Sequence, residues 1–134
     1  MDLPTAFASD LKTLGITTLY LFGSRAQGIA RNSSDYDFGV LLEDPRVIGN
    51  GSQALYQKIY DLLEELPLQR ANLDIVFLDR APLQLRYHVI RYGEVLLDSD
   101  PSRRGRFEER TLEEHADFEP YQRLFDEATL ARIP

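Results

Sequence analysis

The fold is decided by one stretch, LYLFGSRAQGIARNSSDYDFGVLL, which spans residues 19–42. Its two ends are apolar and aromatic and its middle is polar, a pattern that predicts two strands joined by a loop. The second strand opens with Asp35 and Asp37, which are separated by one residue. Because alternate residues of a strand share a face, the two carboxylates project together and repel each other. Either open water or a bound cation must offset that repulsion.

Helical and strand patterns alternate through the rest of the chain. Helices are predicted at residues 4–15, 52–67, 81–93 and from 102 onward. Strands are predicted at residues 16–23, 35–43, 72–79 and 94–98. Residues 24–28 form a turn that could open a short helix, and residues 44–52 form a loop. Ser52 is expected to cap its helix, and Pro120 to kink or break the last one. This order predicts an α/β (α+β) fold, a mixed β-sheet of about four strands with helices packed against it. We expect residues 1–98 to form the core and residues 99–134 a C-terminal helical segment of the same domain.

The composition narrows the class of protein. The 134 residues carry 15 Lys and Arg against 22 Asp and Glu, a formal net charge of -7. That balance argues against general binding to a nucleic-acid backbone, although it permits a nucleotide held through metal ions. There is no cysteine for disulfides or thiolate metal sites, and two histidines are too few for a His-rich zinc site. The start of the chain has no signal-peptide pattern and no apolar run approaches the roughly 20 residues of a membrane span, so we expect a soluble, cytoplasmic protein.

A third carboxylate lies in the strand pattern NLDIVFLD, residues 72–79. Asp74 stands inside an apolar run, where a charge is costly unless it is paired or bound to metal. If this strand lies beside the second, Asp74 reaches the same place as Asp35 and Asp37. Mg²⁺ prefers such oxygen ligands, and two ions bridged by carboxylates stabilise the attacking and leaving oxygens of a displacement. Asp79, at the strand's end, is the rival third ligand, but a turn aspartate facing solvent explains it more simply.

The turn after the first strand suits a phosphate group. Gly23 allows the backbone to approach a phosphate closely, and the N–H groups that follow it form an anion site. The Ser24 hydroxyl can bind a phosphate oxygen, although a serine here can also simply cap a helix. Arg25 is either a phosphate contact or a surface charge. Phosphates on one side and metal ions on the other indicate nucleotidyl transfer.

These residues resemble a known family. Gly23-Ser24, ten further residues and Asp35-Tyr36-Asp37 match the GS-x10-DxD pattern of the DNA polymerase β-like nucleotidyltransferase superfamily. With LDIVFLD and VIRYGEVLLDSD downstream, the chain is similar to minimal nucleotidyltransferases of the MntA type, which are antitoxins encoded beside HEPN-domain toxins of the HepT type. The resemblance covers residues 16–118.

The resemblance implies both a mechanism and a partner. It implies two Mg²⁺ ions held by Asp35, Asp37 and Asp74, with Asp74 helping to deprotonate the attacking hydroxyl. It implies transfer of AMP from ATP to a tyrosine hydroxyl of the partner toxin, which silences the toxin's RNase activity, and a hetero-oligomer of the two proteins. Two alternatives stay open, a nucleotidyltransferase acting on a small molecule such as an aminoglycoside, and a non-catalytic antitoxin that blocks the toxin by occlusion.

The C-terminal segment allows two interpretations. The cluster RRGRFEER, residues 103–110, is typical of a solvated helix face with i,i+4 ion pairs. It could instead be part of a docking surface for the toxin, or its aromatic residues could close the core. The apolar anchors of such a docking surface would be Phe107, Phe118, Tyr121, Leu124 and Phe125. We expect His88 to be a helix-face or core histidine, and His115 to be a solvated neighbour of acidic residues.

Overall fold

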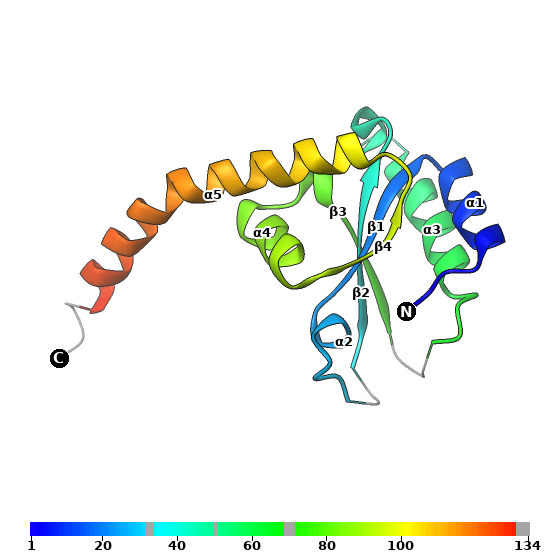
Figure 1. The fold of residues 1–134 in the computed structure, drawn as a ribbon, viewed down its shortest axis with the longest axis horizontal. Helices are drawn as coiled ribbons and strands as arrows, with labels where there is room; N and C mark the ends of the chain where they lie inside the picture. Colours follow the sequence, from blue (N-terminus) through cyan, green and yellow to red (C-terminus); the bar gives the residue numbers. More distant parts are fainter. Residues whose placement is uncertain (32–33, 50, 69–71, 131–134) are drawn as a thin grey trace.

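The computed structural model describes residues 1–31, 34–49, 51–68 and 72–130. Figure 1 shows a central sheet with helices on both sides and one long helix that extends from the body. The elements in chain order are α1 (Thr5–Thr13), β1 (Ile16–Phe22), α2 (Ser24–Gln27), β2 (Tyr36–Leu42), the 3-10 turn η1 (Pro45–Val47), α3 (Ser52–Leu63), β3 (Leu73–Phe77), the 3-10 turn η2 (Leu78–Arg80), α4 (Leu83–Tyr92), β4 (Glu94–Asp98) and α5 (Pro101–Leu130).

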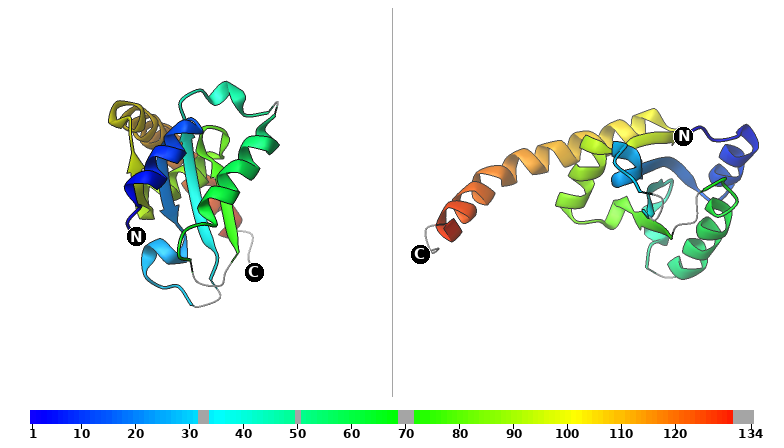
Figure 2. Two further views of the ribbon diagram at one scale, coloured as in Figure 1. Left: turned by 90° about the vertical axis from the view of Figure 1, so that its right-hand side faces the viewer. Right: turned by 90° about the horizontal axis from the view of Figure 1, so that it is seen from below.

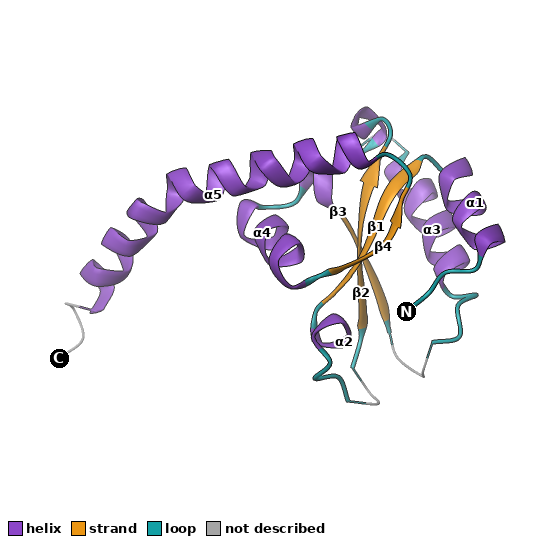
Figure 3. Ribbon diagram, viewed as in Figure 1, coloured by secondary structure: helices purple, strands orange, loops and turns teal. Residues whose placement is uncertain are grey.

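The four strands form one mixed sheet in the order β3-β2-β1-β4. β1 is antiparallel to both β2 and β4, while β2 and β3 are parallel. The parallel pair follows from the crossover helix α3, since parallel neighbours cannot be joined by a tight turn. The predicted mixed four-stranded sheet is therefore confirmed. Figure 3 shows the sheet lying between two sets of helices.

Helices α1 and α3 cover one face of the sheet, and α4 with the first half of α5 covers the other (Figures 1 and 2). Side chains alternate along β2, so that Tyr36, Phe38 and Val40 pack on the α1–α3 side and Leu41 on the α4–α5 side. Asp37 lies between Tyr36 and Phe38 and therefore belongs to the α4–α5 side. The core packing expected for Tyr36 and Phe38 is confirmed.

The start of α3 differs from the prediction. Gly51, with φ of 76°, is the residue that precedes the helix, and the Ser52 side chain caps nothing but donates to the Gly49 carbonyl at 3.3 Å. The predicted Ser52 cap is wrong because the chain enters the helix through a left-handed glycine, which places Ser52 in the first turn. The helix ends at Leu63, and Leu66 is buried in the turn beyond it, so the apolar pattern outlasts the helix.

Helix α5 runs through Pro120 without a break. Figure 1 shows the helix curving over its second half, so of the two expected effects of Pro120, a kink or a break, the helix bends and does not break. A proline inside a helix removes one backbone N–H hydrogen bond and crowds the preceding turn. The outer half of α5 is exposed, so the carbonyl that loses this bond is open to solvent. No helix in the described part of the chain is both long and apolar enough to cross a membrane.

The cluster at residues 103–110 does more than face solvent. The expected i,i+4 pair is present between Arg104 and Glu108 at 3.0 Å, but Arg104 also binds Asp98 of β4 at 2.7 Å. Phe107 is buried against the sheet, and Glu108 accepts a hydrogen bond from the Tyr20 hydroxyl at 2.7 Å. The first half of α5 is therefore anchored to the sheet by charge pairs as well as by apolar packing.

Candidate active site

Gly23 shapes the turn at the end of β1. Its backbone has φ of 75° and ψ of -158°, a conformation open essentially only to glycine. A Cβ atom at this position would lie 2.5 Å from Oδ2 of Asp37, which is closer than carbon and oxygen can approach. The backbone conformation therefore favours glycine, and any side chain at this position would displace the Asp37 carboxylate.

The strand register brings two of the candidate carboxylates side by side. Asp37 of β2 pairs with Asp74 of β3 and, on its other side, with Phe22 of β1, the residue before Gly23. Asp37 is half-buried, while Asp35 and Asp74 are exposed. Burial raises the pKa of Asp37 above its ordinary value, and the negative charges of Asp74 and then Asp35 raise it further. The charges of two neighbouring carboxylates thus act on Asp37 at one end of the sheet, as expected of metal ligands before a cation neutralises them.

Asp74 is held by neighbours on β3 and α3. Its Oδ1 atom accepts from the Ile75 backbone N–H at 3.0 Å and from the Tyr56 hydroxyl at 3.5 Å. Burial and the charge of Asp74 raise the pKa of Tyr56. Within the described ranges, no three Asp, Glu or His side chains are arranged to hold one metal ion.

Asp79 has a structural role that excludes it from this cluster. Its carboxylate forms an ion pair with Arg103 of α5 and accepts the Leu42 backbone N–H at 3.1 Å. The side chain is only 8% exposed, so the expectation of a solvent-facing turn aspartate is wrong. Leu42 is the last residue of β2 and Asp37 is near its start, so Asp79 lies at the opposite end of the strand from the candidate site. The structural role of Asp79 depends on Arg103, which lies 24 residues further along the chain.

Ser24 begins the short helix α2. Gly23 precedes the helix and no side chain caps it, so Ser24 does not act as the cap. The Ser24 side chain is half-buried, and its hydroxyl has no hydrogen-bond partner among the described residues. With only four residues, α2 has little dipole to offer, and the useful groups here are this hydroxyl and the backbone N–H groups after Gly23.

Arg25 holds the loop that leads into β2. Its Nε and Nη2 atoms donate to the Ser34 carbonyl at 3.2 and 2.8 Å, and its guanidinium lies 4.3 Å from the centre of the Tyr36 ring. Ser34 and Tyr36 flank Asp35, so Arg25 positions the segment that carries the first carboxylate. Sequence reasoning missed this role because a bond to a backbone carbonyl nine residues away leaves no signal in residue type.

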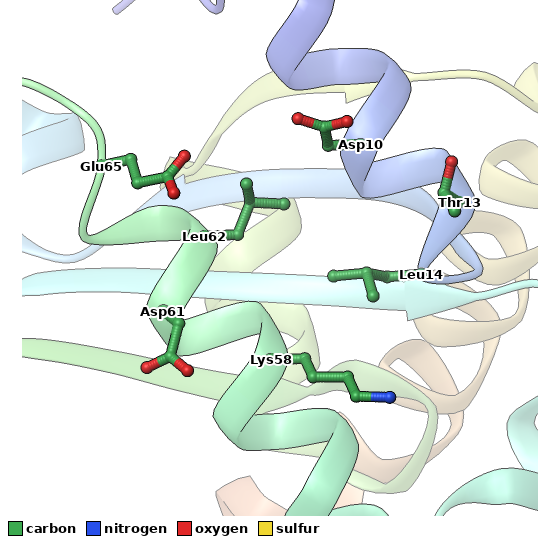
Figure 4. A pocket seen from close by; sticks show the side chains of 7 residues that line it. All are labelled: Asp10, Thr13, Leu14, Lys58, Asp61, Leu62 and Glu65. Carbon is green, nitrogen blue, oxygen red and sulfur yellow. The ribbon is translucent and has the colours of Figure 1, made fainter.

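A separate cavity of about 400 Å³ lies between α1 and α3. Figure 4 shows its lining side chains, which come from the two helices and the residues that follow each of them: Asp10, Thr13, Leu14, Lys58, Asp61, Leu62 and Glu65. None of the six candidate site residues contributes to it. Its mixed charges belong to the outward faces of two amphipathic helices, so it is a surface depression on the α1–α3 layer and not the place where the carboxylates meet.

The two histidines contact aromatic rings. His88 of α4 packs edge-on to Phe22, with 6.5 Å between ring centroids, and lies 5.2 Å from Tyr92, as expected of a helix-face histidine. His115 stacks on Tyr87 with centroids 3.5 Å apart, so the expectation of a merely solvated histidine is wrong. This stack joins α4 to the middle of α5.

Comparison with known proteins decides the family. Residues 9–102 match the family model described as polymerase beta, nucleotidyltransferase. The chain belongs to this nucleotidyltransferase family. The resemblance drawn from the GS-x10-DxD pattern is confirmed, and the matched range contains Gly23, Asp35, Asp37 and Asp74.

Relatives of this nucleotidyltransferase include proteins of toxin–antitoxin pairs. The chain is 32% identical over 97 residues to the protein adenylyltransferase MntA of Aphanizomenon flos-aquae, a match that covers 70% of this chain and 65% of that protein. This chain therefore spans just under two thirds of that relative. A chain from a toxin–antitoxin crystal structure with AMP-PNP has a TM-score of 0.65 at 25% identity, covering 91% of this chain and 98% of that one. A chain from the complex of tri-AMPylated Shewanella oneidensis HEPN toxin with MNT antitoxin has a TM-score of 0.60 at 21% identity, covering 92% and 97%, and shows the shared fold.

Proposed function

We propose that this nucleotidyltransferase is a Mg²⁺-dependent adenylyltransferase that transfers AMP from ATP to a tyrosine hydroxyl of a HEPN-type RNase toxin, and so acts as its antitoxin in the cytoplasm. One observation carries the proposal. At one end of the sheet Gly23 leaves room for the Asp37 carboxylate, and the strand register pairs Asp37 with Asp74. The reaction forms a bond between the tyrosine oxygen and the α-phosphorus, releases pyrophosphate and frees the hydroxyl proton.

The residues fit a divalent cation. Asp35, Asp37 and Asp74 supply only carboxylate oxygens, the ligands that Mg²⁺ prefers. Burial raises the pKa of Asp37 most, and the charges of Asp74 and Asp35 add a repulsion that a cation would offset. Bound there, Mg²⁺ ions would neutralise the phosphates and the oxygens that attack and leave. Asp35 and Asp37 are the ligands we propose on the phosphate side. Asp74 is the proposed acceptor of the tyrosine proton.

Gly23 and Ser24 are the proposed phosphate contacts. The Ser24 hydroxyl and the backbone N–H groups of the turn bind and orient the triphosphate opposite the carboxylates. Arg25 contributes mainly by holding Ser34 and Tyr36 on either side of Asp35, and a direct phosphate contact requires it to leave the Ser34 carbonyl. Within this proposal residues 1–98 are the catalytic core, and residues 99–134 are a helical segment of the same domain.

A protein acceptor suits this open site better than a small molecule. Asp35 and Asp74 are exposed, so a tyrosine presented by another protein has access to them. The adenylyltransferase relative and the AMPylated toxin complex support the choice of AMP and of a HEPN toxin.

The test is intact mass spectrometry of the HEPN toxin encoded beside this chain, after co-expression with the wild type or with Asp35→Ala/Asp37→Ala. We expect one or more added AMP groups with the wild type and none with the variant. Asp10→Ala/Asp61→Ala is the matched control, because it removes two aspartates that line the α1–α3 cavity, and it should modify the toxin as the wild type does.

Two results would overturn the proposal. An unmodified toxin in a stable complex with the wild type would favour neutralisation by occlusion. Transfer of AMP to an aminoglycoside in the absence of toxin, with no transfer to the toxin, would favour the small-molecule alternative.

A further inference from the structure

The outer half of α5 carries an apolar surface that the rest of the protein does not cover. Phe118, Tyr121, Leu124 and Phe125, which we call the outer stripe, have exposed fractions of 40%, 70%, 64% and 70%. Their spacing of three, four and seven residues places Phe118, Tyr121 and Phe125 on one face, with Leu124 at its edge. An exposed cluster of this kind, in contrast to a single apolar residue, marks a surface that binds something.

This face is the continuation of the face that packs against the body. Phe107 and Thr111 are buried on the inner side of α5, and one to two turns further along Glu114 accepts a hydrogen bond from Arg86 at 2.7 Å and His115 stacks on Tyr87. Phe118 follows at the same helical spacing, but it lies beyond the part of α5 that packs on α4. Figures 1 and 2 show the outer half of α5 projecting beyond the body. The helix therefore has an inward-facing apolar stripe with no sheet beneath it.

The charges that border the outer stripe are almost all negative. Residues 113–127 contain six Asp and Glu residues and one Arg, which is Arg123. Asp117 lies on one side of the outer stripe, and Glu119 and Asp126 lie on the other. Arg123 is paired with Glu119 at 3.1 Å, so it does not offset the remaining acidic groups. A complementary surface would be an apolar groove with basic residues along its rim.

We propose that the outer stripe docks into a basic-rimmed apolar groove of the HEPN toxin, an inference that rests on the proposed function. A second copy of this chain fits less well. Outer halves paired with each other would bury apolar against apolar but would bring two acidic borders together. An outer half laid along the first half of α5 would find little to bind. Arg103 and Arg104 are already paired with Asp79 and Asp98, Phe107 is buried, and Leu112 is the exposed large apolar residue on that half.

Docking on the outer stripe is compatible with catalysis. Figure 1 shows the outer half of α5 bending toward the end of the molecule that carries α2, the helix that follows Gly23. A toxin bound to α5 leaves the carboxylates uncovered by the antitoxin's own chain, and its tyrosine can approach them. Docking and chemistry then use different residues, which allows them to be tested separately.

The test compares two variants that add the same charge to opposite faces of α5. Tyr121→Glu/Phe125→Glu places two negative charges in the outer stripe, and Ala116→Glu/Arg123→Gln makes the same change of charge on the other face. The dissociation constant for an RNase-inactive form of the toxin is measured by calorimetry, with circular dichroism to verify that the helix is retained. We expect the stripe variant to bind about 100-fold more weakly or worse, as for the loss of two aromatic anchors, and the control to stay within about threefold of the wild type.

The outcomes separate this inference from the proposed function. Asp35→Ala/Asp37→Ala should bind the toxin normally and transfer no AMP, whereas the stripe variant should regain AMP transfer when the toxin is raised to saturating concentration. Wild-type affinity in the stripe variant overturns the docking proposal. So does a dimer of the chain alone, seen by sedimentation, that the stripe variant converts to monomer. Absence of AMP transfer by the wild type would instead overturn the proposed function and leave the binding result unaffected.

Discussion

The two ends of the sheet carry aspartates in opposite environments. At one end Asp79 is buried, paired with Arg103 and bonded to the backbone of Leu42. At the other end Asp37 is half-buried beside two further carboxylates, and burial together with their negative charges raises its pKa. The comparison teaches that a charge neutralised within the fold stabilises the structure, whereas a charge left among like charges costs stability and is retained for a ligand.

The largest expected effect is on activity at the uncompensated end. Asp37→Asn keeps the size of the side chain but removes one charge and one oxygen ligand, so AMP transfer to the toxin should fall by about 10³-fold or more, by analogy with the loss of other groups that stabilise transition-state charge. Single-turnover transfer of labelled AMP measures it. Retention of more than a tenth of the wild-type rate would show that Asp37 is not a ligand.

The paired end should respond in stability. Asp79→Ala leaves the Arg103 guanidinium, 18% exposed, without its counter-charge, and should lower the free energy of unfolding by about 3 kcal/mol in urea denaturation. Asp79→Leu/Arg103→Met removes both charges and should lose clearly less. Equal losses in the two variants would show that packing and not charge pairing is what Asp79 supplies.

Gly23 connects the two kinds of effect. Gly23→Ala forces a side chain into a left-handed backbone position and against the Asp37 carboxylate, so we expect a loss of about 1–3 kcal/mol in stability together with a loss of AMP transfer. Gly28→Ala is the matched control, because Gly28 also has a positive φ but nothing lies within 4 Å of its added Cβ. A control as inactive as Gly23→Ala would remove the case for a close approach to Asp37.

The smallest expected effect is the pH dependence of the stability that Asp37 contributes. The pKa of Asp37 is raised in the folded state above the ordinary 3.8, so the folded protein binds more protons than the unfolded chain, and the carboxyl loses stabilisation as pH rises through its folded pKa. In EDTA, Asp37→Asn should therefore melt together with the wild type below pH 3.8 and at a higher temperature than the wild type at pH 7. Melting scans at several pH values measure this. A variant less stable than the wild type at pH 7 would contradict the repulsion.

Parts of this protein follow from local sequence alone. The two apolar runs in residues 19–42 determine two strands, because a strand that is buried on both faces reads as an apolar run ended by glycine or polar residues. The spacing from Gly23-Ser24 to Asp35 and Asp37 indicates the nucleotidyltransferase family, because a turn and a pair of same-face carboxylates need only neighbouring residues to define them. The order of helices and strands then leaves few arrangements besides a mixed sheet covered by helices.

Tertiary structure decided what each charged or polar group does. Asp74 and Asp79 look alike in the sequence, each an aspartate in or beside the same strand, yet Arg103 on α5 makes Asp79 structural while Asp74 is left beside Asp37. Arg25 reaches the loop before Asp35, and His115 reaches Tyr87, through contacts that no local pattern encodes.

The same physical reason divides the aromatic residues of α5. Phe107 and Phe118 lie on one helix face with the same periodicity, so the sequence by itself determines only that both belong to an apolar stripe. Whether each is core or surface depends on how far α4 and the sheet extend beneath the helix. They lie beneath Phe107, which is buried, but not beneath Phe118, which is exposed. Periodicity is a property of neighbouring residues, whereas burial is set by segments that meet only after the chain has folded.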